Sequence, residues 1–392
     1  MGNLKDYIKW RGDLAFSKET LSPVDMLIFS QLVYTPLENI DVVDYGKPLR
    51  ELYLSVYPDD APGGSTFVND DLFSLWQFVL ESKRFGDVRL ANFVSKFDAA
   101  QQMQFAAATF EYGDLIVVAF RETDTSVIGW KEDFNMGFES PIPSQVEAVA
   151  YVDALSAFKP LRALKERHDA SPLPDEKQRH AANSLFAYKM QVYLCGHSKG
   201  GNLAMYGGAF CKHPGRIDGI YSFDGPGFDD EVLASKEWAA VKDKVFSFIP
   251  ESSVVGLLLG YCPRYTIVKS DNIGILQHNP FFWHIEGGRF VEAPETSFSS
   301  RLFNGTMHNF LESCPKNQRR VLIETAFKVI EASGAATAND IISGIFKHLG
   351  EVRQILQNVP DEDKHALVEM GRIFAEAGNA SLKSLLGKIL RS

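Results

Sequence analysis

A serine between two glycines is the pattern in this sequence with the clearest potential for chemistry. Gly196, Ser198 and Gly200 form Gly-x-Ser-x-Gly, with an apolar β-type run before it and a helix-forming pattern after it. This order is typical of a nucleophile elbow, a sharp strand-to-helix turn that raises the serine Oγ above a sheet. Glycine suits so tight a turn because it has no side chain to collide with nearby backbone. The alternative is an ordinary turn with a surface serine.

Such a serine needs a base and an acid, because its hydroxyl is a weak nucleophile until the proton is removed. In α/β-hydrolases the acid follows the serine along the chain, and the histidine follows the acid. Asp224 comes directly after an expected strand over residues 217–223, and Glu251 follows another over residues 245–249. Both carboxylates are therefore candidates for the acid.

Two histidines after the serine are candidates for the base. His278 lies in a loop beyond an expected strand at residues 265–269, and His308 lies further along the chain. His284 sits in an apolar, strand-like run and is expected to be structural. His197 precedes the serine, and in an elbow its side chain points away from Oγ, so we expect a structural role there too.

An acyl-transfer site also needs preorganised donors for the negative charge that develops on the substrate oxygen. The main-chain N–H of Lys199, directly after Ser198, is one candidate. The polar loop at residues 121–125 follows an expected strand, and Thr123 can supply a second donor there, with its hydroxyl as a third. The alternative is an ordinary polar loop. We expect the Lys199 side chain to be solvated; the alternative is a preference for negatively charged acyl groups.

Further patterns predict the elements that position these residues. Ser22 begins a helix, residues 69–95 suggest two helices, and residues 105–120 suggest a hairpin. Ser144 with Glu147 resembles a capping box that opens a helix running towards Arg167. A final hairpin is expected at residues 281–291, and the helices expected near the C-terminus are 319–333, 339–349, 361–376 and 381–390.

Alternating strands and helices predict an α/β-hydrolase fold with a mostly parallel central sheet. We expect an N-terminal helical segment or cap over residues 1–100 and the hydrolase core over residues 101–312. Residues 313–392 then form a C-terminal helical extension, which is a candidate surface for homo-oligomer formation.

Composition restricts the function classes. The chain has 392 residues and a formal net charge of −10, which disfavours nucleic acid as a partner because phosphate binding needs a basic surface. Its four cysteines are widely spaced and form no metal-type pair, so we expect reduced thiols, no metal and no cofactor. We find no signal-peptide pattern and no transmembrane segment, since the longest apolar run covers residues 254–261. The prediction is a cytoplasmic protein.

Several motifs carry a family resemblance. The sequence resembles class 3 lipases at residues 118–123, 130–133 and 196–204. It resembles more closely a related bacterial family of unknown function, the Mbeg-like family, over roughly residues 20–345. The motifs of this second resemblance are residues 129–135, 196–204, 223–228, 254–256 and 277–278. The resemblance implies an α/β-hydrolase fold, Ser198 as nucleophile, and Thr123 and Lys199 as oxyanion donors.

The sequence departs from the lipase pattern at two places. Glu122 stands where class 3 lipases usually have glycine, and a carboxylate there is expected to repel an oxyanion or distort the loop. The lipases' acid aligns near Ser253, which cannot serve, so the acid is Glu251 or Asp224; we favour Asp224. The lipase resemblance favours His308 as base. The Mbeg-like resemblance favours His278, which we choose.

The sequence therefore predicts a serine esterase or lipase-like acyl hydrolase that acts through Ser198, His278 and Asp224 on a small-molecule or lipid ester. One alternative is an amidase or acyltransferase on the same triad. The other is a catalytically weak hydrolase-fold protein with a binding or scaffold role, which Glu122 and the helical extension favour.

Overall fold

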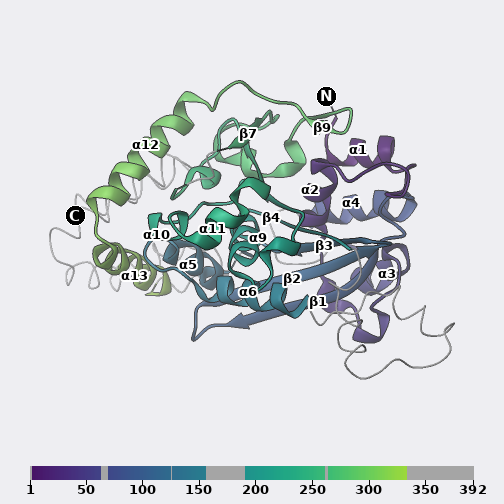
Figure 1. Cartoon of the computed structure of the whole chain (residues 1–392), viewed down its shortest axis with the longest axis horizontal. Coiled ribbons are helices and arrows are strands. Elements are labelled where there is room, and N and C mark those ends of the chain that lie inside the picture. The colour runs from purple at the N-terminus through teal and green to yellow at the C-terminus, as the bar shows by residue number, and fades with distance from the viewer. Residues whose placement is uncertain (1, 63–68, 125, 156–189, 261–263, 333–392) are drawn as a thin grey trace.

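One seven-stranded sheet organises the computed structural model (Figure 1). The structure describes residues 2–62, 69–124, 126–155, 190–260 and 264–332. The strands lie in the sheet in the order in which they occur in the chain, from β1 to β7. Their bounds are β1 Arg89–Asp98, β2 Met103–Tyr112, β3 Leu115–Phe120, β4 Gln191–His197, β5 Gly219–Phe223, β6 Val245–Pro250 and β7 Tyr265–Val268.

The direction of the strands determines where a site can form. Strands β1, β2 and β3 pair antiparallel, whereas each pair from β3 to β7 is parallel. Parallel strands have their carboxyl ends at the same edge of the sheet, and the loops that follow them gather there. The expected α/β fold with a mostly parallel central sheet is confirmed.

Two apolar layers cover the two faces of the sheet. Successive side chains of a strand point to opposite faces, so Ile116 and Val118 belong to one buried cluster and Val117 and Ala119 to the other. Since β3 to β7 step across the sheet in one direction, right-handed crossovers place the connecting helices on one face. The helices in the first cluster are α6 (Pro143–Ala154), α9 (Lys199–Phe210), α10 (Asp230–Leu233) and α11 (Lys236–Val241).

N-terminal helices cover the opposite face. They are α1 (Leu4–Arg11), α2 (Pro23–Leu32), α3 (Leu49–Val56) and α4 (Asn69–Glu81), and they lie at the right of Figure 1. The predicted start of α2 is confirmed, because Ser22 and Asp25 form its capping box. Asp25 also forms a fully buried ion pair with Arg84 at 2.7 Å. This pair fixes the start of α2 to the segment between α4 and β1.

The local predictions are partly confirmed. The hairpin over residues 105–120 is present as β2 and β3, and the final hairpin is present as β8 (Ile285–Glu286) and β9 (Arg289–Phe290). The prediction of two helices over residues 69–95 is wrong in its second half, because β1 begins at Arg89. There, pairing with β2 along the sheet edge decides the conformation.

The predicted capping box at Ser144 is also wrong. Helix α6 has Ile142 as its N-cap, and the Ile142 N–H donates to the Gln145 side chain at 3.0 Å. The Ser144 N–H donates instead to Glu132 at 2.9 Å, because a buried carboxylate lies at the start of this helix. Arg167, where the helix was expected to lead, lies outside the described residues.

Two helices lead out of the sheet region at its other end. They are α12 (Phe298–Ser313) and α13 (Lys316–Ala332), at the left of Figure 1. Phe327 of α13 packs edge-on against Phe134 of α5 (Val127–Asn135), with ring centroids 5.6 Å apart. The helices expected beyond residue 332 lie outside the described residues. No helix in the described part of the chain is long and apolar enough to span a bilayer.

Candidate active site

Ser198 occupies a sharp turn between a strand and a helix. Strand β4 ends at His197 and α9 begins at Lys199, while Ser198 has φ 54° and ψ −132°. A non-glycine residue with positive φ is uncommon and costs energy, so the surrounding structure holds this conformation. A Cβ atom on Gly196 would lie 2.1 Å from the Gly200 backbone, and one on Gly200 would lie 2.2 Å from the Phe120 oxygen. The turn therefore has the geometry of a nucleophile elbow.

Gly200→Ala is expected to destabilise the protein by about 1–3 kcal/mol, because the added methyl group overlaps rigid backbone of β3. Urea unfolding of the purified variant measures this cost. Gly305→Ala is the matched control, since a Cβ at Gly305 in α12 meets no atom within 4 Å. Alanine favours helix there, so the control is expected to be neutral or slightly stabilising. Equal effects at the two positions would contradict the packing argument.

Asp224 lies directly after β5, and its carboxylate is fully buried. Oδ1 accepts a hydrogen bond from the Ser253 hydroxyl at 2.5 Å and another from the Gly256 N–H at 3.0 Å. Oδ2 lies 2.6 Å from Nδ1 of His278. Three polar partners thus compensate the burial of one carboxylate.

His278 ends a short 3-10 helix, Gly274–His278, that follows β7. Its ring lies beside that of His197, the residue before Ser198, with centroids 4.5 Å apart. Burial by itself lowers the pKa of His278, but the hydrogen bond and the charge of Asp224 outweigh it, so this pKa is raised. A proton on Nδ1, directed at Asp224, leaves Nε2 as the nitrogen that can accept a proton.

The other candidates for acid and base lie in different surroundings. His308 is on α12, largely exposed, and pairs with Glu312 one turn further along at 3.1 Å. The backbone of Glu251 is bonded to Val268 and Ser297, whereas the His278 ring is bonded to Asp224. The structure thus brings Asp224 and His278 together next to the elbow.

Hydrogen bonds hold the loop after β3 on both sides of Thr123. The Glu122 N–H donates to the Tyr34 hydroxyl at 3.0 Å, and the Asp124 N–H donates to the Gln104 side chain at 3.2 Å. Among the described residues, the N–H of Thr123 between them has no acceptor, and neither does the N–H of Lys199 at the start of α9. Both groups are therefore available to an oxyanion.

The Thr123 hydroxyl is not available in the same way. It donates to Asp133 of α5 at 2.5 Å, so its hydrogen points at a carboxylate. Desolvation raises the pKa of Asp133 to about 6, although the charge of Lys199 and the Thr123 hydrogen bond oppose the shift. At neutral pH this carboxylate is mostly ionised and accepts the bond. We therefore retain the main-chain N–H of Thr123, and not its hydroxyl, as a candidate donor.

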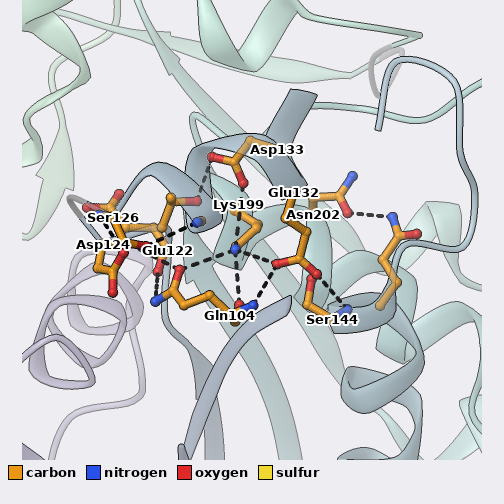
Figure 2. A network of polar contacts seen from close by, with 12 residues as sticks. Gln104, Glu122, Asp124, Ser126, Glu132, Asp133, Ser144, Lys199 and Asn202 are labelled. Carbon is orange, nitrogen blue, oxygen red and sulfur yellow. Dashed lines mark hydrogen bonds and ion pairs between the residues drawn. The ribbon is translucent and has the colours of Figure 1, made fainter. Parts of the chain in front are cut away.

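The Lys199 side chain is neither solvated nor directed at a substrate; it is buried in the polar network that Figure 2 shows. Its Nζ lies 3.0 Å from Glu132, 3.0 Å from the Gln104 carbonyl and 3.6 Å from Asp133. The Glu132 carboxylate also accepts hydrogen bonds from the main-chain N–H groups of Gln104 and Ser144. The network therefore joins α9, α5, α6 and β2 behind the elbow, and both expectations for this side chain were wrong.

Three residues of this site were not singled out from the sequence as functional: Tyr34, Gln104 and Glu132. Gln104 and Glu132 are buried polar residues within or beside apolar segments, and such residues need partners. Gln104 is a polar residue at the start of β2, directly before an apolar run, which was a usable signal. Tyr34 gave no such signal, because its contacts come from residues far away in the chain.

Glu122, His197 and His278 could also be considered as metal ligands. Each offers one ligand atom within 4.8 Å of the others. However, Nδ1 of His197 lies 2.6 Å from Glu122, its Nε2 lies 2.8 Å from the His278 carbonyl, and Nδ1 of His278 is bonded to Asp224. These hydrogen bonds occupy three of the four ring nitrogens, so we interpret the cluster as a polar network.

A cavity of about 360 Å³ adjoins the loop that carries Thr123. Its lining combines aromatic, cationic and anionic side chains. They include Tyr34, Phe97, Lys96, Arg121 and Glu122. The cavity is thus polar on the side where the loop exposes its charged residues.

Comparisons with known proteins place this arrangement in a family. No curated protein matches the chain. The crystal structure of M37 lipase is similar at 15% sequence identity with a TM-score of 0.35, over 88% of this chain and 98% of that one. A similarity this distant leaves function undetermined. The family model described as Mbeg1-like matches residues 79–168 and 170–328, more than half of the chain, and confirms the resemblance seen in the motifs. The protein therefore belongs to the Mbeg1-like family.

Proposed function

We propose that this protein is a serine hydrolase that cleaves carboxylic esters. Ser198 is the nucleophile, His278 the general base and Asp224 the acid that orients the base. The N–H groups of Thr123 and Lys199 form the oxyanion hole. The substrate is a small-molecule or lipid ester.

The observation that carries the proposal is the environment of Asp224. A fully buried carboxylate receives hydrogen bonds from Ser253 and Gly256 and lies 2.6 Å from His278, beside a serine held at positive φ. An ionised, oriented acid fixes the imidazole tautomer and stabilises the imidazolium formed in acyl transfer. A purely structural carboxylate also needs hydrogen-bond donors, but any donor would serve. The donor at Oδ2 is a histidine from the loop after β7, which is the residue type that a catalytic triad requires.

The reaction would proceed in two stages. Nε2 of His278 takes the Ser198 hydroxyl proton as Oγ attacks the ester carbonyl. The oxyanion that forms accepts hydrogen bonds from the main-chain N–H groups of Thr123 and Lys199. His278 then gives the proton to the departing alkoxide, which leaves an acyl-serine. Water, deprotonated by the same nitrogen, attacks the acyl carbon and releases the carboxylic acid and Ser198.

A fluorophosphonate probe tests the proposal because it labels activated serines covalently. Folded wild-type protein is expected to be labelled, and Ser198→Ala is not. The matched control is Ser297→Ala, because the hydroxyl of this serine bonds Ser252 and Ser299 and none of the three proposed triad residues. Product analysis with ester, amide and acyl-acceptor substrates then separates ester hydrolysis from amide hydrolysis and acyl transfer. Absence of labelling in folded wild-type protein would overturn the proposal in favour of a binding or scaffold role.

A further inference from the structure

His197 has an oxygen partner at each ring nitrogen. Nδ1 lies 2.6 Å from Oε2 of Glu122, and Nε2 lies 2.8 Å from the main-chain oxygen of His278. The His197 side chain is 3% exposed and that of Glu122 is 16% exposed, so water competes little for either contact. His197 and its two partners come from three separate segments: the end of β4, the loop after β3 and the turn after β7.

The two oxygens determine how many protons the pair holds. A carbonyl oxygen can only accept, so Nε2 of His197 must carry a hydrogen. A neutral imidazole has no second hydrogen, and a bare Nδ1 would then face an ionised carboxylate at 2.6 Å, lone pair against lone pair. One further proton must therefore lie between Nδ1 and Glu122. Whether it resides on nitrogen or oxygen, Glu122 and His197 together carry no net charge.

We propose that Glu122 and His197 form a charge-neutral positioning pair that holds the main chain of His278 at the elbow and cancels the Glu122 charge beside the oxyanion site. The proposal rests on the proposed function, since it assigns His278 as the base. The pair also removes the repulsion, expected from the sequence, between a carboxylate at position 122 and an oxyanion. Paired with His197, the carboxylate adds no net charge there.

A further contact supports the positioning role. The Tyr34 hydroxyl accepts the Glu122 N–H at 3.0 Å and donates to the His197 carbonyl at 3.3 Å. Main-chain and side-chain contacts thus link the same two residues, and His197 extends the link to His278. The oxyanion loop, the nucleophile turn and the base are thereby kept in one relative arrangement. Such preorganisation matters because small displacements of reacting groups cost large factors in rate.

A charge test distinguishes this role from simple packing. The rate of fluorophosphonate labelling against pH reports the pKa of His278 as the midpoint of its acid limb. The charged groups that face His278 are Asp224, Asp133 and Glu122, and the charge of Glu122 is cancelled as long as it is paired with His197, whose ring lies beside that of His278. His197→Phe keeps an aromatic ring but leaves the Glu122 carboxylate unpaired. A nearby carboxylate favours the protonated imidazole, so the midpoint is expected to rise by about one pH unit.

The companion variants complete the cycle. Glu122→Gln removes the carboxylate and the shared proton together, so the midpoint is expected to stay at the wild-type value. Glu122→Gln combined with His197→Phe is expected to return the midpoint to that value. In both proteins that carry His197→Phe, the maximal labelling rate is expected to be about tenfold below that of the wild type, because the His278 carbonyl has lost its donor. Equal midpoints in all four proteins, or a raised midpoint that persists in the double variant, would overturn the proposal.

His284→Phe is the matched control. His284 also pairs with a carboxylate, that of Asp271 at 2.6 Å, but this pair lies on the surface of the later loops. Its labelling profile is expected to match that of the wild type.

A measurement on the wild-type protein separates failure of this inference from failure of the proposed function. Nitrogen-15 NMR of His197 at neutral pH is expected to show a proton on Nε2 and a second proton shared between Nδ1 and Glu122. A single protonated nitrogen next to an ionised Glu122 would overturn the inference, whether or not Ser198 reacts. An unlabelled Ser198 with the shared proton present would overturn only the proposed function.

Discussion

Replacing Asp224 with asparagine is expected to lower kcat for ester hydrolysis by about 10⁴-fold. An amide nitrogen at the position of Oδ2 would donate to Nδ1 of His278 and force the imidazole proton onto Nε2. The nitrogen that should accept the Ser198 proton would then already carry one. The amide oxygen would still accept from Ser253 and Gly256, so the fold is expected to persist. Steady-state hydrolysis of a short-chain p-nitrophenyl ester, with thermal unfolding as the check on folding, measures both.

Three matched variants show whether the effect belongs to this acid. Ser253→Ala removes one of the donors to Asp224 and leaves the Gly256 N–H, so a loss of about tenfold is expected. Glu251→Gln and His308→Gln are expected to retain wild-type kcat, since neither residue is bonded to His278. Loss of activity in His308→Gln, together with activity retained in Asp224→Asn, would contradict the assignment of Asp224 as the acid and His278 as the base.

Lys199→Met is expected to lower the free energy of unfolding by about 3–5 kcal/mol, because it leaves a buried carboxylate without its cation. Lys199 is 1% exposed and its partner Glu132 is fully buried, with 3.0 Å between Nζ and Oε2. Methionine has a similar length and fills the same space, so the loss is electrostatic and not a cavity effect. Urea unfolding of the variant, compared with the wild type at neutral pH, measures it.

Two controls identify the cause. Adding Glu132→Gln to Lys199→Met removes the uncompensated charge while an amide oxygen can still accept a main-chain N–H, so part of the lost stability is expected to return. Lys96→Met breaks an ion pair with Glu147 that is half exposed, and its cost is expected not to exceed about 1 kcal/mol. A similar cost for Lys96→Met and Lys199→Met would show that burial of the pair is not the cause.

The same network explains why the elbow can tolerate its strained serine. The main-chain N–H of Lys199 is a candidate oxyanion donor, while the Lys199 side chain is bonded to Glu132 and to the Gln104 carbonyl in the buried network. Gln104 in turn bonds the Asp124 N–H beside Thr123. Both candidate oxyanion donors are thus fixed by one buried cluster, which makes their spacing a property of the core.

Sequence alone determined the parts of this protein that depend on neighbouring residues. The spacing of Gly196, Ser198 and Gly200 specified the turn, because steric overlap in a strand-to-helix turn is local. Apolar runs separated by turn residues specified strands β2 to β7, because side-chain alternation and turn conformations are also local. It placed Asp224 and Glu251 after strands, and the preference for Asp224 came from family resemblance and not from any local pattern.

Only the tertiary structure decided which distant groups meet. His278 reaches Asp224, and His308 pairs with Glu312 instead, because the loop after β7 lies over the end of β5 while α12 leads away from the sheet. The Lys199 side chain is buried, contrary to expectation, because α5 and β2 present a carboxylate and a carbonyl to it. Glu122 gains a partner because the ends of β3 and β4 are neighbours in the sheet. Each of these contacts depends on strand order and loop path, which no local pattern encodes.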